Sequence, residues 1–187
     1  ALANLGYVAG EDYDIYYTNG PSSGVGNGLG GRTSGLALEH YRDLLYTAGN
    51  LGVNTLSNGD FNNDPSDDIG ALVNWMSAGN KDLFLTGDNL ASDLGYNAGA
   101  TGLAFLEDVM GLDVATNDIR SFIDNQTSPL VFVTAGNMVL ANVSSWVAYG
   151  GCQGINTFDG VTVRAGAARL AQFGDANNNV GTYAYSA

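Results

Sequence analysis

Short apolar runs alternate with amphipathic segments along the first two-thirds of the chain. The runs at residues 13–18 (YDIYYT), 41–49 (YRDLLYTAG) and 81–87 (KDLFLTG) are rich in aromatic and aliphatic residues. Each run ends at a cluster of Asn, Gly or Asp, so each predicts a strand followed by a turn. A further short strand is predicted at residues 112–116 (LDVAT).

Two segments between these runs have helical periodicity. Residues 68–79 place apolar side chains at i, i+3, i+4 and i+7, namely Ile69, Leu72, Val73 and Met76. Ser66 is the expected N-cap of this helix, and Gly79 is its expected end. Residues 101–111 (TGLAFLEDVMG) predict a second amphipathic helix that ends at Gly111.

From Ser121 onward the pattern changes to short strand-like runs, and residues 168–186 predict a hairpin that turns at residues 175–179. Alternating strands and helices predict a mainly parallel sheet with helices on both faces, in an order near 2-1-3-4. The last third predicts an antiparallel C-terminal extension of that sheet. Since neither a repeat nor a linker interrupts the pattern, we expect a single α/β domain over residues 1–187.

Composition and charge narrow the classes of function. The 187 residues carry 19 acidic and six basic side chains, for a net charge of -13. Nucleic acid and anionic membranes would repel such a chain, and no apolar run is long enough for membrane insertion. A single cysteine, few lysines and abundant Asn, Gly, Ser and Thr are typical of secreted bacterial proteins. We therefore expect a secreted or cell-surface location.

The motifs resemble one family, the class I glutamine-amidotransferase-like domain found inside large secreted bacterial proteins. The resemblance lies in YDIYYTNGPS, YRDLLYTAGN, TLSNGD and LVNWMSAGNKDLFLTGDNLASDL, with LxxLGY near the start and RLAQFGDANNNVGTYAYSA at the end. It implies a three-layer flavodoxin-like α/β fold. The first residues are similar to the last turns of a helix and the final ones to a strand, so we expect a fragment or processed piece of a longer protein.

Active members of that fold carry a cysteine in a tight elbow after the strand that follows the amphipathic helix. Here the elbow reads Leu85-Thr86-Gly87-Asp88-Asn89, before a helix-like pattern, and holds neither Cys nor Ser. Asp88 could act only in haloacid-type or glycosidase-type chemistry. The alternative nucleophile is Cys152, in a Gly-x-Cys-x-Gly string, with His40, the only histidine, as its base. A buried thiol and a surface histidine are the competing interpretations.

Ligands of open α/β sheets bind beyond the carboxyl ends of the strands. That rule predicts a ligand rim of Asn19, Asn50, Thr86, Asp88 and Asn89.

Alternating oxygen ligands precede the first predicted helix and suit Ca²⁺. They are Asp60, Asn62, Asp64 and Asp68. Pro65 and Ala71 stand where a calcium-binding loop of the EF-hand type needs Gly and Glu, so a group of helix-capping residues is the alternative interpretation. No other cofactor is expected.

These features favour a non-catalytic structural or interaction module. Its expected partners are other protein domains or subunits of an extracellular assembly. A cysteine hydrolase or amidase using Cys152, and a Ca²⁺-dependent binding module, remain the alternatives.

Overall fold

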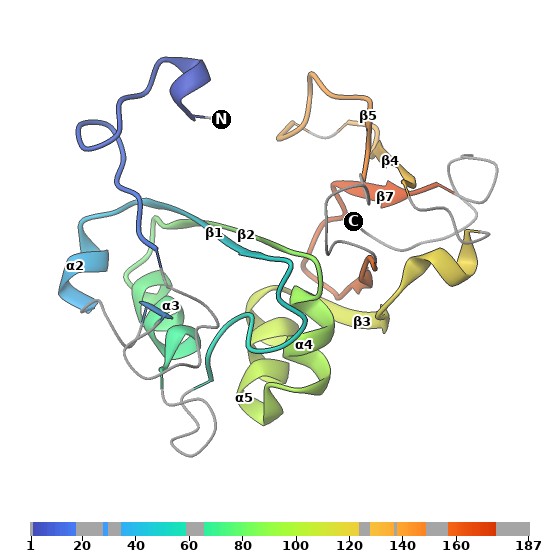
Figure 1. The fold of residues 1–187 in the computed structure, drawn as a ribbon, viewed down its shortest axis with the longest axis horizontal. Helices are drawn as coiled ribbons and strands as arrows, with labels where there is room; N and C mark the ends of the chain where they lie inside the picture. Colours follow the sequence, from blue (N-terminus) through green and yellow to red (C-terminus); the bar gives the residue numbers. More distant parts are fainter. Residues whose placement is uncertain are drawn as a thin grey trace.

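The structure is a computed structural model, and it describes residues 2–17, 28–29, 35–58, 66–123, 128–136, 138–148 and 157–174. Helical and extended elements are both present, so the fold is mixed α/β (Figure 1). The short helical turns are η1 (Leu2–Leu5), η2 (Phe105–Val109) and η3 (Ile119–Phe122). The α-helices are α2 (Gly35–Glu39), α3 (Asp68–Ser77), α4 (Leu90–Tyr96) and α5 (Gly99–Ala104). The strands are β1 (Asp43–Gly49), β2 (Asp82–Gly87), β3 (Leu112–Thr116), β4 (Leu130–Val133), β5 (Ser145–Val147), β6 (Gly160–Val163) and β7 (Ala171–Phe173).

The centre of the N-terminal part is a parallel pair of strands, β1 and β2. Their register runs from Asp43 opposite Asp82 to Gly49 opposite Gly87. Because parallel strands need a crossover, the chain passes through α3 between them. Helices α3, α4 and α5 all lie on one side of the strands (Figure 1).

Helix α3 is present as predicted: Ile69 and Leu72 of its expected apolar face are buried together with Trp75, whereas Val73 is 39% exposed. Its N-cap is Asp67 rather than the expected Ser66: the Asp67 side chain accepts a hydrogen bond from the Gly70 backbone N–H.

At the other end of α3, Gly79 adopts a φ of 73° and donates its N–H to the Met76 carbonyl, as expected of a helix end. The Trp75 indole N–H donates to the Tyr41 carbonyl at 2.9 Å, and the Lys81 ammonium donates to the same oxygen at 2.7 Å. Both contacts anchor the start of β1 to the helix.

The first core lies between the two strands and their helices. Its fully buried centre includes Leu56, Leu72, Leu94, Phe105 and Leu106. The inward side chains of the strands pack against it: Leu44, Tyr46, Leu83 and Leu85.

A buried carboxylate connects the loop after β1 to α4 in this core. Asp93 is 1% exposed and accepts hydrogen bonds from the backbone N–H and the hydroxyl of Thr55, both at 2.8 Å. The Asn97 amide also donates to it, at 3.2 Å.

The C-terminal part has a second core and antiparallel strands. β3 pairs with β6, while β4 pairs with β5 and β7. The second core consists of Ile119, Ile123, Val131, Ala171 and Phe173. The antiparallel character is as predicted, but these strands form sheets of their own instead of extending β1–β2.

Three other expectations differ from the structure. β1 and β2 are direct neighbours, so the order 2-1-3-4, which would place the first predicted strand between them, is wrong. Residues 14–17 of that predicted strand do not pair with any described strand, and Tyr13 forms an isolated bridge with Ala9. The helix predicted at residues 101–111 begins two residues earlier, at Gly99 of α5, and ends as the π-helical turn η2. The hairpin turn at residues 175–179 lies outside the described residues.

The Asp93 carboxylate generates a stability prediction. Asp93→Ala leaves the buried Thr55 donors without their acceptor, which should reduce the free energy of unfolding by about 3 kcal/mol. Urea unfolding measures the loss. Asp108→Ala, which removes an exposed carboxylate, is the matched control and should stay within about 0.5 kcal/mol of the wild type. Equal losses in the two variants would contradict the role of Asp93.

Candidate functional site

The candidate site begins at the carboxyl ends of β1 and β2. The Asp88 backbone N–H donates to the Gly49 carbonyl at 2.9 Å, which keeps the two strand ends together. Asn89 then precedes α4, so the predicted strand, turn and helix are present. Thr86 and Asn50 are exposed on this rim, whereas Asp88 and Asn89 are partly buried.

Residues 157–159 of the C-terminal part contact this rim. The Asp159 carboxylate (Oδ2) accepts the backbone N–H of Ser92 at 2.9 Å. The Thr157 hydroxyl donates to the Asn89 side-chain oxygen at 3.2 Å. Two polar contacts, between residues 67 and 68 positions apart, therefore join the strand end of the first core to the second core.

Turn η3 contributes an ion pair near the same place. Asp118 caps η3 by accepting the Arg120 backbone N–H, and the Arg120 guanidinium binds both carboxylate oxygens of Asp118 at 2.7–3.0 Å. Burial alone would raise the pKa of Asp118, but the hydrogen bonds and charge of Arg120 outweigh it and lower that pKa.

Asp88 is the titratable side chain of the predicted rim, and its pKa is shifted. Burial, and then the negative charge of Asp159, raise the pKa of Asp88 to about 6, while Arg120 acts in the opposite direction. Among the described residues, Asp88 Oδ1 has no hydrogen-bond partner, and neither has Asp159 Oδ1. Burial also raises the pKa of Asp159, against the hydrogen bonds from Ser92. Both carboxyl groups thus have raised pKa values, and the charge of Asp159 acts on Asp88.

Proton binding is the chemistry that these carboxyl groups support. Thr86, the one hydroxyl of the elbow, is exposed. The described non-glycine residues with positive φ are Asn54 and Asn80, so Asp88 lacks the strained backbone of a nucleophile elbow. The described residues also contain no group of three or more His, Cys, Asp or Glu side chains placed to hold a metal ion.

The structure does not bring His40 to this rim. His40 is exposed and precedes β1, whereas Asp88 follows β2, at the opposite end of two parallel strands. A seven-residue strand separates these ends by roughly 20 Å. Cys152 and Asn19 lie outside the described residues.

Of the four predicted calcium ligands, Asp68 is the one that the structure describes. Asp60, Asn62 and Asp64 lie outside the described residues. Asp68 is fully buried in the first turn of α3, where it accepts a hydrogen bond from the Ser66 hydroxyl at 3.1 Å. Its backbone N–H donates to the Ser57 hydroxyl at 2.9 Å. These contacts give Asp68 a structural role at the helix start, and the calcium site stays a prediction.

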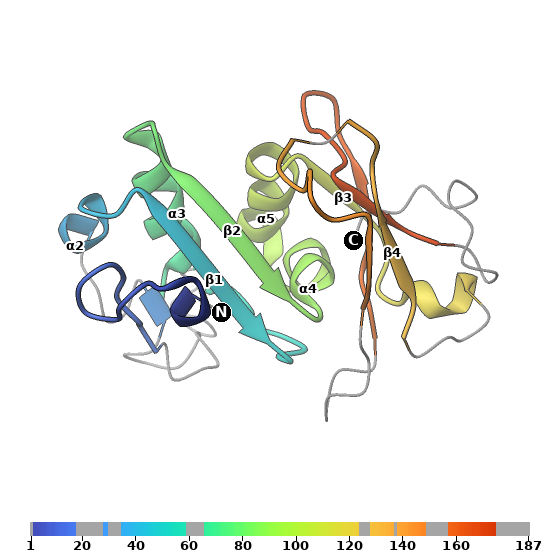
Figure 2. The same ribbon diagram turned by 90° about the horizontal axis from the view of Figure 1, so that it is seen from above.

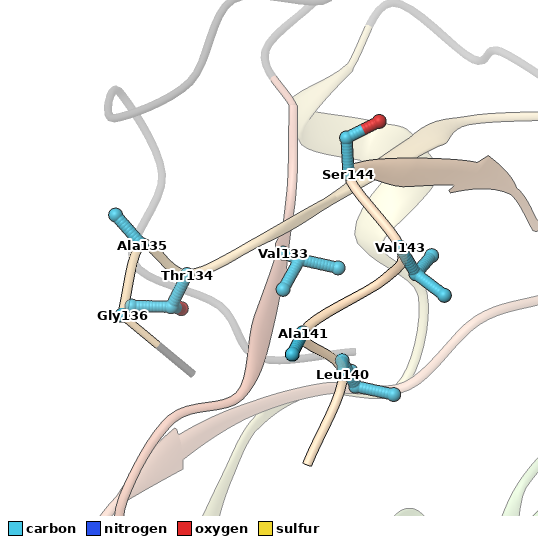
Figure 3. A pocket seen from close by; sticks show the side chains of 8 residues that line it. All are labelled: Val133, Thr134, Ala135, Gly136, Leu140, Ala141, Val143 and Ser144. Atoms are coloured by element: carbon cyan, nitrogen blue, oxygen red, sulfur yellow. The ribbon is translucent and has the colours of Figure 1, made fainter. Parts of the chain in front are cut away.

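A hollow lies in the C-terminal part. Its volume is about 240 Å³ (Figure 3). The lining residues are Val133, Thr134, Ala135, Gly136, Leu140, Ala141, Val143 and Ser144. Ser144 points away from the other side chains in Figure 3. The described part of this lining is mainly apolar and contains no titratable side chain, so it can take an apolar group.

Comparison with known proteins adds no family assignment, since no protein-family model, curated protein or solved structure matches the chain. The resemblance to amidotransferase-like domains therefore stays a hypothesis. Among the described helices, none combines the length and hydropathy needed to cross a membrane.

The ion pair on η3 generates a prediction for the rim. Arg120→Leu removes the positive charge that lowers the pKa of Asp88, so that pKa should rise above about 6. The pKa of Asp118 should rise as well, because it loses its hydrogen bonds from the guanidinium. Carboxyl ¹³C NMR titration measures both. Arg164→Leu, at an ion pair with Glu107, is the control and should leave the pKa of Asp88 unchanged. A pKa of Asp88 that is the same in both variants would contradict the placement of Arg120.

Proposed function

We propose that this chain is a non-catalytic, secreted or cell-surface interaction module that binds a helix of another domain or subunit across the outer face of β1–β2. We define the outer face by Leu45, Thr47, Phe84 and Thr86. Asp43 and Asp82 lie at the end of this face where the two strands begin.

The observation that carries this proposal is the exposed apolar centre of the outer face. Leu45 and Phe84 lie opposite each other in the register and are 67% and 60% exposed. Figure 2 looks onto this face, with α3 behind the strands. The backbone of the N-terminal segment Leu2–Leu5 lies on the same side of the strands as this face (Figure 1) and beside β1 in Figure 2.

Parallel sheets normally bury both faces, because crossover helices cover them. In this chain helices α3, α4 and α5 lie on one face of the strands. On the other face, Leu45 of β1 and Phe84 of β2 are exposed to water. Burying such side chains contributes about 1.5–3 kcal/mol each.

The chemistry of the face indicates what covers it. Asp43 and Asp82 have side chains that are 62% and 66% exposed, and Arg42 is the described cation beside them. The chain as a whole has a net charge of -13. A complementary partner is therefore a helix that is apolar along one side and basic near one end. Such a helix would supply the third layer that the amidotransferase-like resemblance implies.

The elbow supports the non-catalytic part of the proposal. It presents an aspartate on unstrained backbone, and the described histidine lies at the other end of the strands. The acidic surface and the composition support an extracellular location, where a soluble module must resist non-specific association.

A peptide pair tests the outer face directly. The full chain should bind a fluorescent 18-residue amphipathic Leu/Lys helix more tightly than a Leu/Glu helix of the same pattern. Leu45→Asn/Phe84→Asn should weaken Leu/Lys binding at least tenfold, since a tenfold loss corresponds to only about 1.4 kcal/mol. Fluorescence anisotropy measures both affinities.

The control separates the face from general electrostatic attraction. Val73→Asn/Leu103→Asn removes two apolar side chains, each 39% exposed, on helices α3 and α5. That variant keeps the net charge and should bind the Leu/Lys peptide as the wild type does. Equal peptide binding by the wild type and both double variants would reject the outer face as the docking surface. If the wild type dimerises and Leu45→Asn/Phe84→Asn does not, the partner on this face is a second copy of the chain instead of a helix of another protein.

Thiol labelling tests the enzyme alternative. A non-catalytic Cys152 should react with iodoacetamide no faster than N-acetylcysteine between pH 6 and 8, because an unactivated thiol has a pKa near 8.5. Mass spectrometry of the intact chain follows the reaction. Fast labelling at pH 6 that is lost in His40→Ala would favour the cysteine hydrolase over the interaction module.

A further inference from the structure

The two cores meet through a short extended segment whose side chains alternate in direction. Phe158 packs against the second core, 6.3 Å from the Phe173 ring, and its carbonyl accepts the Ile119 backbone N–H at 2.8 Å. Its neighbours Thr157 and Asp159 reach the other way, to Asn89 and to the Ser92 backbone N–H. Such alternation is the geometry of extended backbone. Residues 157–159 are therefore held by both cores at once.

The contacts of this segment with the first core are polar, and two of them involve acids. Asp159 binds the start of α4, directly after the turn that carries Asp88. We call the set formed by Asp88, Asn89, Ser92, Thr157 and Asp159 the carboxyl joint. In it, both Asp88 Oδ1 and Asp159 Oδ1 are buried atoms without a hydrogen-bond partner among the described residues.

Charged groups from each neighbouring element act on the joint. Asp88 comes from the end of β2 and Asp159 from the segment before β6. Asp93 of α4 adds negative charge near Asp159, while its own carboxylate is bound to Thr55. From η3, Asp118 adds negative charge and Arg120 positive charge near Asp88. Among these groups the acids outnumber the cations, because Arg120 is the one cation and it is already paired with Asp118.

We propose that the carboxyl joint is a proton-dependent latch between the two cores, closed when the Asp88–Asp159 pair holds a proton and loosened when both carboxyl groups are ionised. Binding a proton converts one carboxylate into a carboxyl group, which has an O–H donor. The joint then holds one negative charge fewer in a partly buried place, and the repulsion that Asp159 exerts on Asp88 is relieved.

The direction of the pH effect follows from the two states of Asp88. Its pKa is about 6 in the folded chain and about 3.9 when unfolded, so the folded state binds the proton more tightly. The stabilisation is fully present below about pH 4 and is lost as the pH rises through 6. The raised pKa of Asp159 has the same sign. The latch therefore weakens between about pH 4 and pH 7.

Thermal unfolding of the full chain from pH 4 to pH 8 tests the latch. Asp88→Asn replaces the ionisable group by a neutral amide of the same shape. Its melting temperature should approach that of the wild type near pH 4 and exceed it by about 4 °C at pH 8. Asp159→Asn should show the same convergence at low pH and divergence at pH 8, and the double variant should gain less than the sum.

Two controls distinguish the latch from general repulsion in an acidic chain. Asp108→Asn removes one exposed carboxylate and should leave the pH dependence of the wild type unchanged. About 0.5 M NaCl shortens the screening length to roughly 4 Å, which suppresses surface repulsion but not the partly buried pair. The difference between Asp88→Asn and the wild type should therefore persist in salt.

Hydrogen exchange locates the effect in the joint. The protection factor of the Ser92 amide, corrected for intrinsic exchange, should fall about tenfold between pH 5 and pH 8, because one unit of pKa difference is a tenfold change. Amides of the buried helix α3 should change less. A Ser92 protection factor that is constant over this range, or a melting-temperature difference that does not depend on pH, would overturn the proposal. Should Asp88→Asn fail to fold, ¹³C titration of the wild-type Asp88 carboxyl decides the question, and an ordinary pKa near 4 rejects the latch.

Discussion

The parallel pairing of β1 and β2 is the constraint on which the rest of the structure depends. Parallel strands cannot be joined by a hairpin, so the chain between them must cross over, and α3 is that crossover. The crossover gives the sheet a covered side and places both carboxyl ends at one edge. The first core, the rim around Asp88 and the outer face with Leu45 and Phe84 are three consequences of this single arrangement.

Apolar packing and polar contact have different tasks in this molecule. Each core is closed by aliphatic and aromatic side chains that are almost completely buried. The contact between the cores depends on hydrogen bonds and carboxyl groups around Asn89, Ser92 and Asp159. Packing free energy is almost independent of pH, whereas the free energy of a partly buried carboxyl pair is not. The chain can thus have stable cores and still have a contact between them that responds to protons.

The rim combines an acid with a local pattern that enzymes also use. The strand, turn and helix around Asp88 follow each other as in folds that present a nucleophile there, and here the turn carries an acid whose raised pKa reflects burial and Asp159. The polar groups at this edge of the strands contact the second core through Thr157 and Asp159.

The sequence by itself determined the local elements whose periodicity is strong. The spacing of Ile69, Leu72, Val73 and Met76 predicted α3 because one face of a helix collects residues three and four apart, and Gly79 marked its end. It also placed Asp88 after β2, since a strand followed by a turn and a helix is a local pattern. Only the tertiary structure decided that β1 and β2 are neighbours, that the antiparallel strands are separate from them, and that Asp159 and Arg120 approach Asp88. The reason is physical: periodicity reports which side of an element is apolar, whereas contacts between residues 67 positions apart depend on how whole faces pack.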